Sequence, residues 1–178
     1  MDEIVRYQLR KPAASVADNL VLAPVPVEKE VTRLIDGLRK VYHDKHPDFD
    51  VRIETGMQFR GDTGDFLELA GNLLDNACKW CERQVRISVV PSVGARAIAS
   101  GMVLTVSDDG PGIPDDAAKA LLQRGMRLDE STPGHGIGLA VVKDIAHSYG
   151  GRLKIGRSEL GGAEIMVSIP PVATAKGD

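Results

Sequence analysis

The residues of this sequence most suited to chemistry are polar side chains repeated at helical spacing in E-L-A-G-N-L-L-D-N-A-C-K-W-C, residues 68–81. The apolar residues of the stretch recur every three or four positions, which predicts a helix with one face in the core. Its other face would carry a column of carboxylates, carboxamides and an ammonium group: Glu68, Asn72, Asp75, Asn76 and Lys79. Because asparagine is a mediocre helix former, two of them one turn apart indicate a function. Binding a metal ion together with phosphate oxygens is such a function.

Two glycine-rich loops further along the chain could complete a ligand site. The first is D-D-G-P-G-I-P, residues 108–114, which follows a stretch that predicts a buried strand. Its two glycines allow the backbone to approach a flat ligand, and Asp108 could accept a hydrogen bond from an exocyclic amine. An acidic turn without a ligand is the alternative for this loop.

The second loop is G-H-G-I-G-L, residues 134–139, and a predicted helix begins within it. Backbone N–H groups at a glycine-rich helix start form a phosphate site. The spacing lacks the longer gap of the dinucleotide fingerprint, and the loop is not a P-loop because no G-K-[ST] follows. Taken alone, these glycines could also serve only as turn residues.

The elements that must position these stretches follow from the periodicity of the apolar residues. Helices are predicted over 27–42, from the loop before Phe66 to about Glu82, over 115–122, and over 137–149 with a C-cap at Gly150 and Gly151. Strands are predicted over 49–53, 84–91, 101–107, 152–155 and 163–169, with a short edge strand in 20–27 and a hairpin formed by 84–91 and 101–107. This order predicts an α+β fold, a two-layer α/β sandwich in which helices cover one face of a mixed, mainly antiparallel sheet.

Length and composition limit the class of protein. The sequence has 178 residues, of which 43% are hydrophobic and 26% charged, as expected for one soluble globular domain. A net charge of -3 gives no electrostatic argument for nucleic acid or an anionic membrane. No apolar run approaches the ~20 residues that span a bilayer, and no signal peptide opens the sequence. Cys78 and Cys81 are expected to be half-buried, reduced thiols of a cytoplasmic protein, since a zinc site would need a second ligand pair.

Taken together, N-L-L-D-N-A-C-K, D-D-G-P-G-I-P and G-H-G-I-G-L resemble the motifs of the ATP-binding domain of the GHKL superfamily. Within that superfamily they are similar to those of sensor histidine kinases, and most similar to the PhoQ type. The resemblance covers roughly residues 27–169 and implies the Bergerat fold, with a catalytic ATP-binding domain at 16–170. Residues 1–15 would then be the remnant of a dimerisation-domain helix and linker, and residues 171–178 a disordered tail.

The resemblance implies ATP and Mg²⁺ as cofactors. Asn76 would ligate Mg²⁺ with Asn72 assisting, and Lys79 would neutralise phosphate charge. Trp80 would stack near the adenine, with a core aromatic as the alternative. The residues implied to contact nucleotide are Asn72, Asn76, Lys79, Trp80, Asp108, Gly110, Gly112, Ile113, Gly134, His135, Gly136, Ile137, Gly138, Leu139 and Gly162.

A mobile lid over residues 123–133 is also implied by the resemblance. Arg124 and Arg127 would reach the γ-phosphate from this lid, unless they belong to a merely solvated loop. With Asn72, Asn76 and Lys79, they make up the implied catalytic set. Leu122 stands where the family usually has a phenylalanine.

Two absences decide which reaction the resemblance implies. ATP-hydrolysing relatives place a glutamate one turn before the metal asparagine, whereas this sequence has Asn72, which cannot accept a proton. Glu68 lies a further turn back. The phospho-acceptor motif, a histidine followed by an acidic residue, a basic residue and proline, is missing, and His43, His46 and His147 are expected to be surface or structural residues.

The expected activity is therefore that of a protein-histidine kinase domain in two-component signal transduction. It would donate the γ-phosphate of ATP to a histidine on its own dimerisation domain, and a response regulator would receive the phosphate afterwards. The full-length protein would be a membrane-anchored homodimer, and this fragment a soluble cytoplasmic monomer with no nucleic-acid partner. One alternative is a stand-alone GHKL switch protein that binds a partner, as anti-sigma-factor kinases do. Another is an ATPase of the gyrase or mismatch-repair kind, which Asn72 and the small size disfavour.

Overall fold

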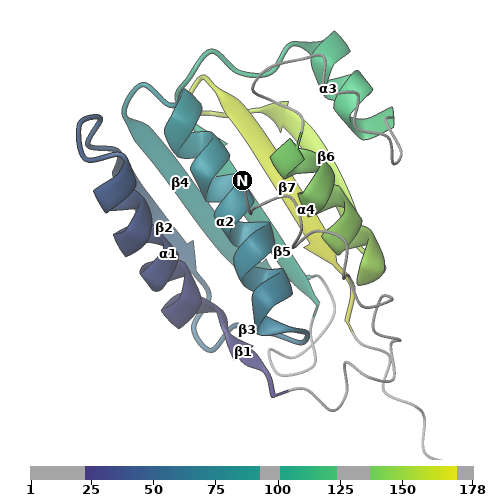
Figure 1. Ribbon diagram of the computed structural model, residues 1–178. Helices are drawn as coiled ribbons and strands as arrows, with labels where there is room; N and C mark the ends of the chain where they lie inside the picture. Colours follow the sequence, from purple (N-terminus) through teal and green to yellow (C-terminus); the bar gives the residue numbers. More distant parts are fainter. Residues whose placement is uncertain (1–22, 93–100, 124–136, 172–178) are drawn as a thin grey trace, which may run out of the picture.

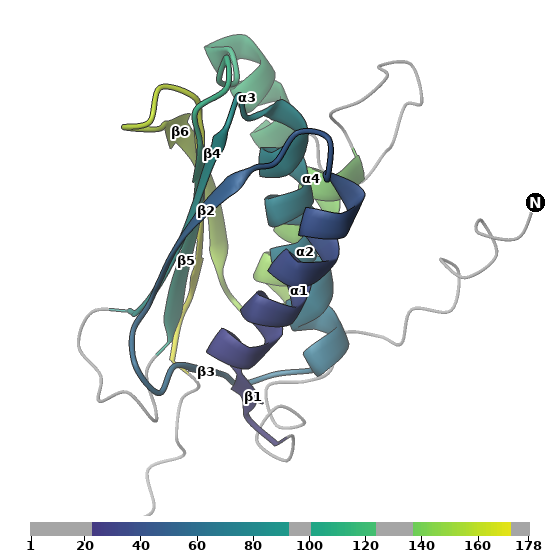
Figure 2. The same ribbon diagram turned by 90° about the vertical axis from the view of Figure 1, so that its left-hand side faces the viewer.

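The computed structural model describes residues 23–92, 101–123 and 137–171, without the side chains of 121–123 and 137. A five-stranded sheet forms one layer, and helices pack on one of its faces (Figures 1 and 2). The elements in chain order are β1 Val25–Pro26, α1 Val27–Val41, β2 Asp48–Ile53, β3 Gln58–Phe59, α2 Thr63–Trp80, β4 Gln84–Pro91, β5 Met102–Asp108, α3 Asp115–Gln123, α4 Ile137–Ser148, β6 Arg152–Arg157 and β7 Ala163–Ile169.

The strand order of the main sheet is β2-β4-β5-β7-β6. The β2–β4 pair is parallel, whereas β4–β5, β5–β7 and β6–β7 are antiparallel. The predicted sandwich, the mixed and mainly antiparallel sheet and the 84–91/101–107 hairpin are therefore confirmed. None of the helices in the described ranges has the length and apolarity that a bilayer crossing requires.

The central helix α2 lies between α1 and α4 over the middle of the sheet (Figure 1). A side chain caps its start, because the Asp62 carboxylate accepts hydrogen bonds from Gly64 N at 2.8 Å and Asp65 N at 3.2 Å. Its apolar stripe faces the sheet and is fully buried at Phe66, Leu69, Ala70, Leu73 and Leu74. These residues pack with the inward side chains of β4, β5 and β7 into one continuous core.

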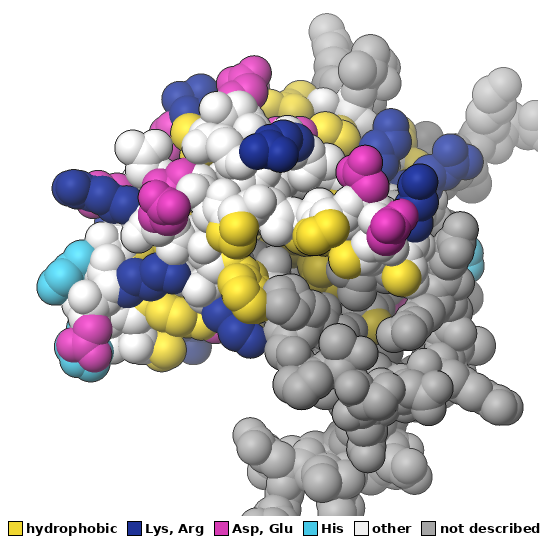
Figure 3. Space-filling view, turned by 90° about the horizontal axis from the view of Figure 1, so that it is seen from above, with side chains coloured by type: hydrophobic (Ala, Val, Ile, Leu, Met, Phe, Trp, Pro, Cys, Tyr) yellow, Lys and Arg dark blue, Asp and Glu magenta, His cyan; other side chains and the backbone are white. Residues whose placement is uncertain are grey.

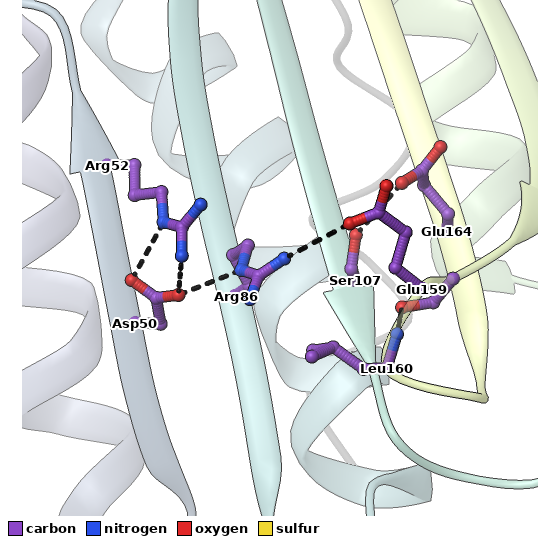
Figure 4. Close-up of polar contacts among 8 residues, drawn as sticks. Asp50, Arg52, Arg86, Ser107, Glu159, Leu160 and Glu164 are labelled. Carbon is purple, nitrogen blue, oxygen red and sulfur yellow. Dashed lines mark hydrogen bonds and ion pairs between the residues drawn. The ribbon is translucent and has the colours of Figure 1, made fainter.

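The opposite face of the sheet is polar, as Figure 4 shows. Asp50, Arg86, Ser107 and Glu164 stand opposite one another on β2, β4, β5 and β7. Arg86 Nε lies 2.8 Å from Asp50 Oδ2, and Ser107 Oγ donates to Glu164 Oε2 at 3.3 Å. Because the helix layer covers only one face of the sheet, apolar residues that face the helices alternate along the strands with polar residues on the open face.

The short edge strand expected in 20–27, followed by a helix start, is confirmed as β1, which pairs with β3 in a separate two-stranded sheet. Two details of the prediction were wrong. Helix α2 ends at Trp80 rather than near Glu82, because Cys81 has extended backbone angles, φ −58° and ψ 152°. The cysteines are not half-buried but buried, with Cys78 at 0% and Cys81 at 2% exposure. Both are free thiols, and burial raises the pKa of Cys78 to about 12.

Candidate functional site

The three sequence motifs meet at one end of the sandwich, the upper end in Figure 1. There α2 ends, β5 leads into the D-D-G-P-G-I-P loop, and α4 begins. Figure 3 shows this end of the molecule, where apolar side chains reach the surface between charged groups. The site is therefore assembled from segments that lie far apart in the sequence.

Asn72 joins α2 to the start of α4. Its Nδ2 donates to the main-chain oxygen of Glu68 at 2.6 Å, which fixes the orientation of the carboxamide. Its Oδ1 faces Gly138 so closely that a Cβ added at Gly138 would lie 2.9 Å from it. The glycine thus leaves the space that the asparagine side chain occupies, and the two motifs are brought together as predicted.

Asn76 lies one helical turn after Asn72 and is partly buried. In the part of the chain that the structure describes, its carboxamide has no hydrogen-bond partner, so its oxygen is available to a ligand. The described residues contain no cluster of three or more His, Cys, Asp or Glu that could hold a metal ion. A hard cation here would therefore need phosphate or water oxygens besides the amide oxygen.

Asp108 ends β5 and is only 3% exposed. Its Oδ1 accepts hydrogen bonds from Gly110 N at 2.9 Å and Ala163 N at 3.2 Å, and its main-chain oxygen accepts from Gly162 N at 3.1 Å. Burial raises the pKa of the Asp108 carboxyl, while the two N–H donors oppose that rise. The result is a buried acceptor held by backbone amides, with Oδ2 outside these two bonds.

Glycines surround this carboxylate because no side chain would fit. A Cβ on Gly110 would clash with the carbonyl oxygen of Trp80, and one on Gly162 would clash with Asp108 itself. Gly112 has φ +82°, a backbone conformation that favours glycine. Gly110, Gly112 and Gly162 therefore lie together around the Asp108 carboxylate, and their contact with a ligand stays a prediction.

The end of α2 carries Lys79 and Trp80. The Lys79 ammonium lies 5.3 Å from the centroid of the Trp80 ring, in cation–π range, and Trp80 is partly buried. The predicted polar column is wrong at Asp75, whose carboxylate faces α1 and accepts from Tyr42 Oη at 2.9 Å. Helix geometry explains this, since successive residues such as Asp75 and Asn76 point about 100° apart.

A pocket of about 410 Å³ adjoins the D-D-G-P-G-I-P loop. Gly112, Ile113 and Gly162 are the predicted site residues in its wall. The rest of the wall comes from the loop, α3 and the end of β6: Pro111, Pro114, Asp115, Ala118, Ile155, Gly156 and Arg157. The β6 residues were missed because strand order, not sequence spacing, places β6 beside this loop.

Asp109 was also left without a role by the sequence. Its carboxylate accepts hydrogen bonds from Glu82 N at 2.9 Å and from Arg83 N at 3.0 Å. Burial acts to raise the pKa of Asp109, but these backbone donors outweigh it and lower the pKa below the ordinary value. The loop after β5 is thereby fastened to the chain that leaves α2.

Several predicted site residues lie outside the described residues: Arg124, Arg127, Gly134, His135 and Gly136, together with the side chains of Leu122 and Ile137. The predicted lid, the 1–15 remnant and the tail from 172 also lie there, apart from the start of the lid in α3. Leu139 is described and is 4% exposed, within the core. His43, His46 and His147 are exposed, as expected of surface histidines.

Comparison with known proteins identifies the class. The sequence pattern of the family described as histidine kinase-, DNA gyrase B-, and HSP90-like ATPase matches residues 61–173. The chain belongs to this family of ATP-binding domains, which confirms the predicted superfamily and the ATP ligand.

Particular relatives narrow this class to sensor kinases. The chain is 43% identical to sensor protein kinase CarS of Pseudomonas aeruginosa over 159 residues, covering 89% of this chain and 34% of CarS. It is 40% identical to sensor protein PhoQ of Escherichia coli K12 over 142 residues, covering 80% of this chain and 28% of PhoQ. Among solved structures, a mycobacterial sensor histidine kinase, MprB, superposes with a TM-score of 0.68 at 28% identity, covering 85% of this chain and 98% of that one. The chain is thus homologous to the catalytic domains of sensor histidine kinases, and it spans about a third of the curated relatives' length.

Proposed function

We propose that this chain binds ATP with Mg²⁺ and donates the γ-phosphate to a histidine on the dimerisation domain of a two-component sensor kinase. The observation that carries the proposal is the contact between Asn72 of α2 and Gly138 at the start of α4. A carboxamide at this junction can bind oxygen ligands or metal waters but cannot take a proton from water. The site is therefore suited to holding a phosphate donor with slow hydrolysis.

The donor set fits a magnesium nucleotide. Asn76 has an unengaged amide oxygen within the described part of the chain, and Asn72 lies one turn away with its orientation fixed. When bound, Mg²⁺ would neutralise charge on the phosphates. Lys79 would add a positive charge beside them, and the glycines Gly134, Gly136 and Gly138 would offer backbone N–H groups.

The adenine would bind at the buried Asp108. A carboxylate whose Oδ1 is held by Gly110 N and Ala163 N can present Oδ2 to an exocyclic amine. Ile113, in the wall of the adjoining pocket, and Trp80 would supply apolar contact. Arg124 and Arg127 would approach the γ-phosphate from the lid.

The phosphate acceptor would lie on another domain. Residues 1–15 would be the remnant of the dimerisation helix, 16–170 the catalytic domain, and 171–178 a tail. In the full-length protein a response regulator would take the phosphate from the dimerisation domain. That protein would be a membrane-anchored homodimer, with this domain in the cytoplasm.

Phosphotransfer to a separately made dimerisation domain tests this function. The full chain is mixed with the dimerisation domain of the same protein and ATP labelled at the γ-phosphate. We expect an acid-labile label on a histidine of the dimerisation domain, and none on this chain. Rapid release of inorganic phosphate without such a label would instead support an ATPase of the gyrase or mismatch-repair kind.

A further inference from the structure

Lys45 lies in the turn between α1 and β2, far in sequence from every motif of the site. Its Nζ donates to the main-chain oxygens of Cys78 at 3.0 Å and Lys79 at 2.8 Å. These carbonyls belong to the last turn of α2, where the helix itself has no N–H groups left to offer. An ammonium at this position also meets the negative end of the helix dipole.

The turn that Lys45 holds is the one that carries the site residues. Asn76, Lys79 and Trp80 all lie in the last turns of α2, and the carbonyl of Trp80 packs against Gly110 of the loop. A shift of this helix end would therefore change the separation between the asparagine motif and Asp108. Asp109 holds the chain just beyond the helix, at Glu82 and Arg83.

The charge of Lys45 acts on the same region. Burial raises the pKa of Asp108, the negative charge of Asp109 adds to that rise, and the ammonium of Lys45 opposes it. Burial also raises the pKa of the Cys81 thiol just after α2; the Lys45 ammonium opposes that rise, and the charges of Asp109 and Asp108 add to it. Lys45 is thus one of several groups that act on the pKa of the Asp108 carboxyl, after burial and its two backbone N–H donors.

We propose that Lys45 is a positioning residue of the nucleotide site, which fixes the last turn of α2 relative to Asp108. This inference rests on the proposed nucleotide-binding function. A role limited to closing the α1–β2 turn does not need the ammonium, because the turn is closed by Lys45 N donating to Tyr42 O at 3.0 Å.

Tyr42 supplies a matched control in the same turn. Its Oη donates to Asp75 Oδ1 at 2.9 Å, which also joins this turn to α2. Tyr42→Phe removes that bond without touching the carbonyls of Cys78 and Lys79. If any weakening of the contact between α1 and α2 lowers nucleotide affinity, Tyr42→Phe should lower that affinity as well.

The experiment measures the dissociation constant of the full chain for a non-hydrolysable ATP analogue with Mg²⁺ at about pH 8. Lys45→Met should weaken binding by about tenfold, because the last turn of α2 loses both hydrogen bonds from the ammonium. Lys45→Arg, which keeps the charge and can donate to both carbonyls, should restore most of the affinity. Tyr42→Phe should bind within about twofold of the unmodified chain.

Three results would overturn the inference while leaving the proposed function intact: Lys45→Met binding as tightly as the unmodified chain, Tyr42→Phe losing as much affinity, or no recovery in Lys45→Arg. Failure of the unmodified chain to bind nucleotide would instead contradict the proposed function. If circular dichroism shows that Lys45→Met is unfolded, Lys45→Gln takes its place. This variant lacks the charge and can donate to the carbonyls less completely, so an affinity equal to that of the unmodified chain would also overturn the inference.

Discussion

The carboxamide of Asn72 occupies the space that Gly138 leaves by having no side chain. An added Cβ at that position would lie 2.9 Å from Asn72 Oδ1, closer than such contacts allow. The same two helices are joined at their other ends, where Tyr149 Oη, just after α4, donates to Asp65 Oδ2 at 2.7 Å. The asparagine helix and the glycine-rich helix start are thus held as one unit, and substitutions at their junction should affect ligand binding more than stability.

Gly138→Ala tests this junction. The new methyl group would push the Asn72 carboxamide, which is the end of a flexible side chain, out of its present orientation. We expect nucleotide affinity to fall by at least about tenfold, with a loss of stability of about 1 kcal/mol or less.

Gly37→Ala is the matched control for that substitution. Gly37 is an exposed helical glycine with nothing within 4 Å of an added Cβ. Alanine there should stabilise the protein by about 0.5–1 kcal/mol and leave nucleotide affinity unchanged. Calorimetric titration and urea denaturation of both variants separate the two effects, and an affinity equal to that of the unmodified chain in Gly138→Ala would contradict the role of the junction.

Asn76→Ala should abolish Mg²⁺-dependent nucleotide binding, because it removes the amide oxygen that has no partner in the described structure. Asp75→Asn, one residue earlier, is the control. The Asp75 side chain contacts Tyr42 rather than the site, and the amide oxygen of asparagine can still accept that bond. A titration in which Asn76→Ala kept its affinity and its Mg²⁺ dependence would remove the magnesium role of Asn76.

Much of the fold was predictable because its signals are local. The apolar stripe of α2 and the hairpin of β4 and β5 depend on residues close together in the sequence, and both were confirmed. The motif set placed Asn72 and Gly138 in one site, but their direct contact was found only in the structure. The direction of the Asp75 side chain was not predicted. Asp75 and Asn76 both fit spacings of three and four from other polar residues, although adjacent helical side chains point about 100° apart.

The site residues that could not be predicted from the sequence are brought to the site by the arrangement of the strands and helices. Arg157 and Ile155 line the pocket because β7 places β6 beside the loop after β5. Lys45 reaches the end of α2 from a turn that precedes it by more than thirty residues. Strand order leaves no pattern in the sequence. Nor does a single long side chain that joins the α1–β2 turn to the end of α2.

Burial raises the pKa of Asp108. As the pH is lowered, nucleotide binding should therefore begin to weaken at a higher pH than it would with an aspartate of ordinary pKa. The ionised carboxylate is the form that accepts from an amine, so affinity is lost as pH falls through the raised pKa. The effect on stability has the opposite sign. A group with a raised pKa binds its proton more tightly in the folded state, so this group's contribution to stability falls as pH rises through that range.

Asp108→Asn checks this assignment. Its amide oxygen can still accept from Gly110 N and Ala163 N, so the variant should remain folded, but its amide nitrogen would face the ligand amine as a second donor. We expect at least about tenfold weaker binding at about pH 8 and no remaining pH dependence from this residue. Titrations between about pH 5 and about pH 8 compare the two proteins, and parallel pH profiles would exclude Asp108 as the titrating group.

His46 holds a backbone conformation that suits glycine. It is exposed, its φ is +48°, and it is the one non-glycine residue with positive φ in the described ranges. A non-glycine residue in the left-handed region destabilises the folded state by about 1 kcal/mol. Glycine avoids this strain, but its greater freedom in the unfolded chain offsets part of the gain. His46→Gly should therefore stabilise the protein by up to about 0.5 kcal/mol, whereas His43→Gly in the same turn, at a residue without positive φ, should destabilise it by about 0.5–1 kcal/mol. Urea denaturation of the two variants measures the difference, and equal midpoints would show that the turn stores no such strain.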